Sequence, residues 1–293
     1  MLWKKTLRGA EQYQQGSMKI PRSTQEMIPV KRILNDGTFV LDSGEYSKMF
    51  AFTDINYTEL RDEEKMRRLV DYSALLNSID KGIYAKISIF FRPIRQEQFE
   101  RDVLIPMNPE DELDDYRENM NTVLREQVRG TLGMTKQAYL TITAGRRNDE
   151  DAAAFFARVE GNLIGSFQAL GVELRAVPLS ERLRLLHDIY RPGLEETFRF
   201  DAHAEKKLGM NWKDSIAPLS AEALNSCTYL KIGGRYCKTL FLNAYPIYLN
   251  DRIVSDVASI GKPMIFTIDF LPIPSAEAMA EAESRSMAID TKI

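Results

Sequence analysis

One stretch near the middle of the chain limits the fold more than any other, because it predicts a short helix with a sharp end. Residues 178–193 read Pro-Leu-Ser-Glu-Arg-Leu-Arg-Leu-Leu-His-Asp-Ile-Tyr-Arg-Pro-Gly. Ser180 is a good N-cap because its hydroxyl can accept from amides of the first turn. Pro192-Gly193 ends the helix, since proline cannot donate and glycine allows the turn that follows. Leu183, Leu186, His187 and Tyr190 have the spacing that places side chains on one face of a helix.

Length and charge exclude several classes of protein. A chain of 293 residues suits one large domain or two ordinary ones. Its net charge of −3 argues against a generic nucleic-acid binder, which carries a clear basic excess. We expect no membrane span, because no run reaches about 18 apolar residues, and no signal peptide, because the N-terminus lacks an apolar core.

The two cysteines, Cys227 and Cys237, are not expected to bond to each other. If Ile232-Gly233-Gly234-Arg235 closes a two-residue hairpin, Cys237 faces the side of Leu230 and Cys227 points to the opposite side. Two unpaired thiols fit a reducing cytoplasm.

Residues 1–27 are polar and basic without sustained periodicity, and we expect a flexible arm. A solvated tail is the favoured interpretation, and a contact arm for an anionic surface is the alternative. The basic residues that could make that contact are Lys4, Lys5, Arg8, Lys19, Arg22, Lys31 and Arg32, against only Glu11 and Glu26 in the same region.

Residues 28–190 are expected to form a first α/β domain. In chain order, the patterns predict strands at 33–42 and 46–52, a helix at 59–79, a strand at 84–92, a helix at 111–131, a strand at 138–143, a helix capped by Asn148 and a strand at 172–177. Apolar stripes along the three helices are expected to lie in the core. They are Met66, Leu69, Tyr72, Leu76 and Ile79; Leu113, Tyr116, Met120, Leu124 and Val128; and Phe156, Val159, Leu163, Phe167 and Leu170.

Residues 191–226 lack a strong period and are expected to be a connector to a second α/β unit at 227–293. That unit should hold a hairpin at 229–242, a short helix near 248–258, a strand at 264–271 and a helix from about Ser275. This order repeats that of the first domain, and residues 87–94 align with residues 266–273. The expected fold is therefore α+β, with two related hairpin-helix-strand-helix units, antiparallel or mixed sheets and helices packed on one face. We expect the second unit to be truncated at Ile293 and the chain to be part of something longer.

Motifs for nucleotide or metal chemistry are weak. Residues 233–239 and 259–263 each resemble part of a phosphate-binding loop but lack its glycine and hydroxyl spacing, so both are expected to be ordinary turns. His187 is expected to be a core histidine. Two histidines and two scattered cysteines do not have the spacing of metal ligands.

Four carboxylates cluster where the helix at 111–131 begins: Asp111, Glu112, Asp114 and Asp115. Paired carboxylates can serve acid–base chemistry, but charges in a first turn more often complement the helix dipole. We therefore predict no catalytic, nucleotide-binding or metal-binding residue in this chain.

An ordered set of short motifs carries a resemblance to a known family. They are Ile28-Pro29-Val30-Lys31-Arg32-Ile33, Asp36-Gly37, Tyr46-Ser47-Lys48, Asp54-Ile55-Asn56-Tyr57, Leu185 to Gly193, Ser215-Ile216-Ala217-Pro218, Arg235-Tyr236 and Thr239-Leu240-Phe241-Leu242. Together they resemble the N-terminal region of the VirB-type conjugal-transfer ATPases of type IV secretion systems, as found on Gram-positive conjugative elements. The resemblance runs from about Ile20 to Ile293.

The resemblance implies a docking and assembly module that acts by protein–protein contact. In that family a motor domain carrying the nucleotide-binding motifs follows this region. The proteins self-associate, lie in the cytoplasm at the inner face of the membrane, and drive conjugal DNA transfer through a membrane channel. The motor is absent here, so the resemblance implies no ATP hydrolysis by this chain, with ATP and Mg²⁺ confined to the missing motor. The expected partners are subunits of the secretion channel, with no sequence-specific nucleic acid.

Three alternatives stay open at this point. One is a self-contained small-molecule enzyme that uses the His187 face or the acidic helix start. The second is a stand-alone adaptor, and the third is a nucleic-acid module.

Overall fold

The computed structural model describes residues 21–53, 60–79, 82–94, 96–127, 134–201, 209, 211–224, 228–242, 256–257, 259–273, 276–277, 279–280 and 283. The chain divides into two compact units, each built from two separate stretches of sequence. Residues 1–31 and 180–241 form the first, which we call the small unit. Residues 32–179 and 242–293 form the second, which we call the sheet unit.

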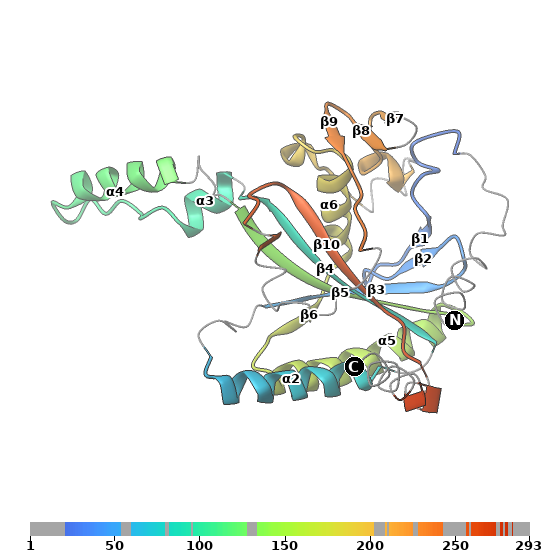
Figure 1. Cartoon of the computed structure of the whole chain (residues 1–293). Coiled ribbons are helices and arrows are strands. Elements are labelled where there is room, and N and C mark those ends of the chain that lie inside the picture. Colours follow the sequence, from blue (N-terminus) through green and yellow to red (C-terminus); the bar gives the residue numbers. More distant parts are fainter. Residues whose placement is uncertain are drawn as a thin grey trace, which may run out of the picture. The chain divides into compact units, whose positions relative to one another are not determined.

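A seven-stranded sheet is the centre of the sheet unit (Figure 1). Its order is β1-β2-β3-β5-β4-β10, and β6 pairs with the end of β3 that β2 leaves open. The registers of β2–β3, β3–β5, β5–β4, β4–β10 and β3–β6 are all antiparallel. The strands are β1 (Val30–Ile33), β2 (Phe39–Leu41), β3 (Tyr46–Phe52), β4 (Ile83–Pro93), β5 (Met134–Ala144), β6 (Leu174–Ala176) and β10 (Met264–Phe270). The expected α+β class is confirmed.

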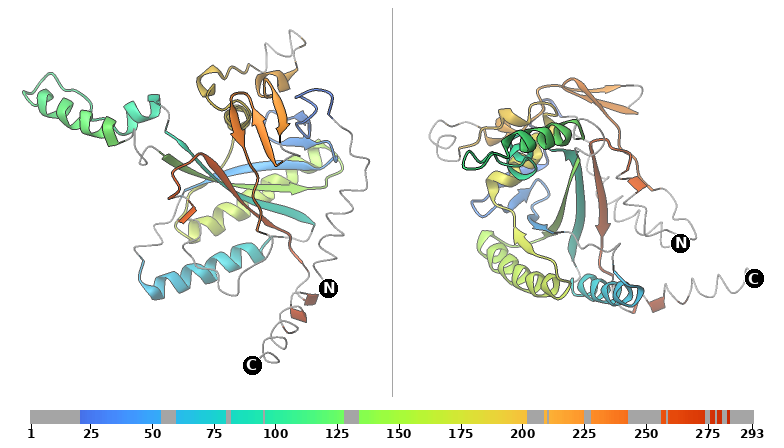
Figure 2. Two further views of the ribbon diagram at one scale, coloured as in Figure 1. Left: turned by 45° about the horizontal axis from the view of Figure 1, so that its top comes forward. Right: turned by 90° about the vertical axis from the view of Figure 1, so that its left-hand side faces the viewer.

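The core lies on one face of this sheet. In β4 the alternation of apolar residues from Ile83 to Ile89 places Ala85 and Ile87 on that face, where both are buried. Two helices, α2 (Asp62–Asn77) and α5 (Asp149–Ala169), contribute to the same core and lie side by side along the sheet (Figure 2). The expectation of helices on one face of the sheet agrees with this arrangement.

Helix α5 forms as its sequence predicts. The Asn148 side chain accepts a hydrogen bond from the Asp151 amide at 2.8 Å, so it is the predicted N-cap. Its apolar stripe lies in the core as expected, with Phe156 at 0% exposure and Val159 partly buried. The stripe of α2 behaves differently, because only the C-terminal half of that helix reaches the core. Leu75 is buried there, whereas Met66 is 62% exposed and Leu69 is 53% exposed. The prediction that Met66 and Leu69 are core residues is therefore wrong.

Residues 94–133 form an insert between β4 and β5, since Pro93 pairs directly with Met134. The insert holds α3 (Gln96–Asp102), which the sequence patterns did not indicate, and α4 (Asp114–Gln127). The core role predicted for the apolar residues along the helix at 111–131 is wrong for those at its start. Leu113, Tyr116 and Met120 are 52%, 73% and 54% exposed, and Val128 lies outside the described residues.

The small unit is built around α6 (Leu179–Tyr190). The helix starts two residues earlier than expected, so Ser180 lies in its first turn and is not the N-cap. The predicted end is confirmed, with Gly193 at φ +89°. The expected connector at 191–226 is structured where it is described, with the short 3-10 helices η3 (Glu195–Thr197) and η4 (Trp212–Ser215) and the strand β7 (Ala221–Leu224).

Strand β7 pairs with β8 (Tyr229–Ile232), and β8 pairs with β9 (Arg235–Cys237) in a second, three-stranded sheet. Ile232 pairs with Arg235 around Gly233-Gly234, which confirms the predicted hairpin turn. Cys237 is a free thiol opposite Leu230, as expected, and Cys227 lies outside the described residues. The hairpin is shorter than predicted, because regular pairing stops at Cys237.

Strand β10 was expected to belong to a separate second unit, but it is part of the main sheet. It pairs with β4, so that Ile268 faces Ile87 and Phe266 faces Ile89, and Phe270 packs against the main core. The two similar octapeptides are therefore neighbours in one sheet. The expected boundaries at 190 and 226 also differ from the compact units, because 242–293 groups with 32–179. The helix predicted near 248–258 and the helix predicted from Ser275 lie mostly outside the described residues.

Candidate interaction surfaces

One arginine joins two of the motif segments inside the small unit. Arg191 follows α6, and its Nε donates to the carbonyl of Ala217 at 2.8 Å. Its Nη2 donates to the carbonyl of Asp214. Ile216 is fully buried and Ala217 is 4% exposed, so this segment is a packed part of the unit. The motifs at 185–193 and 215–218 are thus in direct contact.

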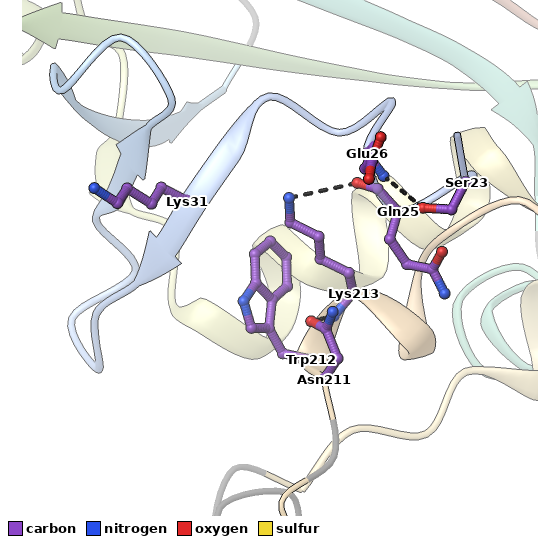
Figure 3. A pocket seen from close by; sticks show the side chains of 7 residues that line it. All are labelled: Ser23, Gln25, Glu26, Lys31, Asn211, Trp212 and Lys213. Carbon is purple, nitrogen blue, oxygen red and sulfur yellow. Dashed lines mark hydrogen bonds between the residues drawn. The ribbon is translucent and has the colours of Figure 1, made fainter. Parts of the chain in front are cut away.

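Lys213 extends this cluster to the segment that precedes β1. Its Nζ donates to the carbonyls of Ile28 at 2.9 Å and Gln25 at 3.4 Å. The Gln25 side chain in turn donates to the carboxylate of Asp214 at 2.9 Å. A surface hollow of about 420 Å³ lies beside these contacts, lined by Ser23, Gln25, Glu26, Lys31, Asn211, Trp212 and Lys213 (Figure 3).

The polar groups of this hollow mostly hold the backbone in place. Asn211 caps η4 by accepting from the Lys213 amide at 3.1 Å. Glu26 accepts from the backbone amide of Arg22 at 2.9 Å, and Ser23 accepts from the amide of Glu26 at 3.3 Å. Lys213 points toward the Gln25 carbonyl, whereas the exposed Lys31 comes from β1 (Figure 3). This arrangement stabilises a turn and offers no activated nucleophile or acid–base pair among these residues.

His187 is a packed core histidine, as predicted. It has no exposed surface, and its ring lies 5.3 Å from that of Phe198 and edge-on to it. Its Nε2 is 3.4 Å from the hydroxyl of Thr197, and its Nδ1 is 3.6 Å from a carboxylate oxygen of Asp188. Burial lowers the pKa of the imidazole and outweighs the Asp188 carboxylate, so the neutral form is favoured. A substrate has no access to this side chain as it is placed.

The carboxylates at the start of α4 form a structural ion cluster. The Arg117 guanidinium contacts Asp111 at 2.5 Å and Asp114 at 2.7 Å. Hydrogen bonds from Arg117 lower the pKa of Asp111 to about 2, and the backbone amide of Asn108 contributes most to the lowered pKa of Asp114. Carboxylates with lowered pKa values are poor proton donors near neutral pH. Glu112 and Asp115 are exposed to solvent.

Only part of the predicted basic surface falls on described residues. Lys4, Lys5, Arg8 and Lys19 lie outside them, and Arg22 and Lys31 are exposed. Arg32 forms a two-bond pair with Asp149, at 2.8 and 3.1 Å, and Tyr46 donates to the same carboxylate at 2.7 Å. The charge of Arg32 is therefore balanced inside the sheet unit.

Exposed apolar side chains are the feature that the sequence patterns do not indicate. They gather at the outer strand β10 and the residues just after it, where Ile265, Ile268, Leu271 and Ile273 are 37–61% exposed. A second group lies along α4. A third group, in the small unit, contains Tyr236, Leu240 and Phe241, which are 69–83% exposed. Apolar patches of this kind mark sites of contact with other molecules.

Comparisons with known proteins add no relative: no family model matches the chain, and no curated protein matches it. Within the part of the chain that the structure describes, no helix has the length and apolar content needed to cross a membrane.

Proposed function

We propose that this chain is an N-terminal docking and assembly module of a conjugative type IV secretion ATPase, acting by protein–protein contact at the inner face of the cell membrane. The ordered motifs that resemble the VirB-type ATPases support the choice of system. Two of these motifs, at 185–193 and 215–218, are joined by the Arg191 hydrogen bonds. ATP and Mg²⁺ would belong to the motor that follows this region in the family.

The observation that carries the proposal is the edge strand β10. Within the described residues it pairs with β4 on one side only. An edge strand presents unpaired backbone donors and acceptors, and proteins normally protect such edges with charges or proline. The strand reads Met-Ile-Phe-Thr-Ile-Asp-Phe, so Asp269 is its one charged residue.

That single charge does not protect the edge, because it is paired toward β4. Lys86 lies 3.4 Å from the Asp269 carboxylate, and the Tyr84 hydroxyl donates to it at 2.6 Å. Ile265 and Ile268 project from opposite faces of the strand and are 43% and 37% exposed. An added strand from a partner could form backbone hydrogen bonds here and bury apolar side chains on both faces.

The test is recovery of the secretion channel with the chain. A tagged chain is expressed in cells that carry the conjugative channel, and membrane fractions are solubilised and purified through the tag. We expect channel subunits to copurify, and Ile265→Lys to reduce their recovery about tenfold, because an apolar contact is lost.

Thr267→Lys is the matched control, since it adds the same charge to an exposed position of the same strand without removing an apolar contact. We expect this variant to recover channel subunits at nearly the wild-type level. The proposal is wrong if the wild-type chain recovers no channel subunit, and the role of β10 is wrong if Ile265→Lys recovers channel subunits as well as the wild-type chain does.

A further inference from the structure

The exposed stripe of α4 has the spacing of a helix that packs against a partner. Leu113, Tyr116, Met120 and Val123 follow at intervals of three, four and three residues, and they are 46–73% exposed. This is the spacing of a coiled-coil seam, and such a seam gains stability only when another segment covers it. We call these four residues the α4 stripe.

The stripe is held outward by bonds on other sides of the helix. Asn121 is 2% exposed, accepts from the Ile105 amide at 2.8 Å and donates to the Ile105 carbonyl at 2.9 Å. Arg117 pairs with Asp111 and Asp114, as described above. These contacts join α4 to the loop before it through side chains that are not part of the stripe.

The charge around the stripe is strongly negative. Residues 96–127 contain ten acidic and three basic side chains, a net charge of −7 in a chain whose total is −3. Arg117 and Arg125 each form ion pairs with carboxylates of the insert, and Arg125 lies 2.8 Å from the Glu118 carboxylate. Glu112, Asp115 and Glu126 are exposed, and the structure describes no ion pair for them. The occupant of the stripe should therefore be basic as well as apolar.

Residues 1–20 of this same chain have that chemistry. They carry Lys4, Lys5, Arg8 and Lys19 against the single acid Glu11. Apolar residues, Leu2, Trp3 and Leu7, are interleaved with the first three basic ones. The stripe residues are at least 46% exposed, so another copy can reach them.

We propose that the α4 stripe binds the basic N-terminal segment, residues 1–20, of a second copy of the chain. This contact deepens the assembly role proposed above, because it names the two surfaces that join copies. Both surfaces belong to the chain itself, so they can be tested without the secretion channel.

The experiment is sedimentation velocity of the full chain over a range of concentrations. We expect association at about 50 mM salt that weakens toward about 500 mM, because the attraction between an acidic and a basic surface is screened. An excess of a synthetic peptide of residues 1–20 should compete and return the chain to monomers.

Two variants test the two surfaces separately. Replacing both Tyr116 and Met120 by Ser, and replacing both Lys4 and Lys5 by Glu, should each weaken association at least tenfold. Leu69→Ser removes a similarly exposed apolar residue from α2 and should leave association unchanged. Circular dichroism and the thermal midpoint confirm that each variant is folded.

The inference is overturned if the wild-type chain stays monomeric at about 100 µM, a concentration that would reveal even a weak contact. It is also overturned if association persists in either double variant. Failure here leaves channel recovery through β10 intact, whereas a chain that associates as expected but recovers no channel subunit contradicts only the proposed docking function.

Discussion

Replacing Asn121 by Ala should release the loop that precedes α4 without unfolding the sheet unit. The Asn121 amide makes two hydrogen bonds to the backbone of Ile105, one as acceptor at 2.8 Å and one as donor at 2.9 Å. Because Asn121 is only 2% exposed, these bonds are shielded from water. Each is worth about 1 kcal/mol, so the loop loses about 2 kcal/mol of local stability.

Hydrogen exchange of the Ile105 amide measures this loss directly. Because this amide donates to Asn121, its exchange requires local opening. A loss of about 2 kcal/mol should speed that exchange about 30-fold, since about 1.4 kcal/mol is a factor of ten. The amides of β4 and β5 should keep their protection.

Asn119→Ala is the control, because it makes the same chemical change at an exposed position of the same helix. Both variants gain helix propensity equally, which cancels from the comparison. Equal exchange of the Ile105 amide in the two variants would refute the role of Asn121.

Three further predictions concern local structure. Asn148→Ala should cost about 1 kcal/mol in urea unfolding, because it removes the α5 N-cap, and an unchanged midpoint would contradict this. Gly44→Ala should lower the free energy of unfolding by about 1 kcal/mol, because the φ of this residue is +87°. Gly37→Ala should lower it further, because the added Cβ would also lie 2.5 Å from the Val177 carbonyl oxygen. Equal losses in the two variants would refute this clash. The Asp111–Arg117 pairing should contribute its full stabilisation of the folded state above pH 3.8, the ordinary carboxyl pKa, and lose it as the pH falls through about 2. The reason is that the pKa of Asp111 is lower in the folded state than in the unfolded state. Titration of Asp111 by NMR checks this, and Arg117→Gln should raise its pKa toward 3.8.

Some features could be predicted because their signals are local. The Asn148 cap, the apolar stripe of α5 and the alternation of β4 each depend on neighbours within one or two turns of chain. The Gly233-Gly234 hairpin depends only on two residues that tolerate a tight turn. His187 was placed in the core for a similar reason, since it shares a helical face with Leu183.

The candidate surfaces could not be predicted in the same way. An apolar stripe looks the same whether the chain or another molecule covers it, so the pattern predicts a core position for Leu113, Tyr116 and Met120 although all three are exposed. Arg191 and Lys213 bind backbone carbonyls, and carbonyls are present at every residue, so no pattern of side chains indicates such contacts.

The sequence by itself therefore determined where most helices and strands lie and which face of each is apolar. The tertiary structure alone decided which of those faces are covered and which strands are neighbours. Strand β10 has a pattern that suits any sheet, and only its pairing with β4 made it the edge of the main sheet. The physical reason is range: helix caps, turns and alternation act between residues close in sequence, whereas burial and strand pairing depend on segments that chain folding brings together.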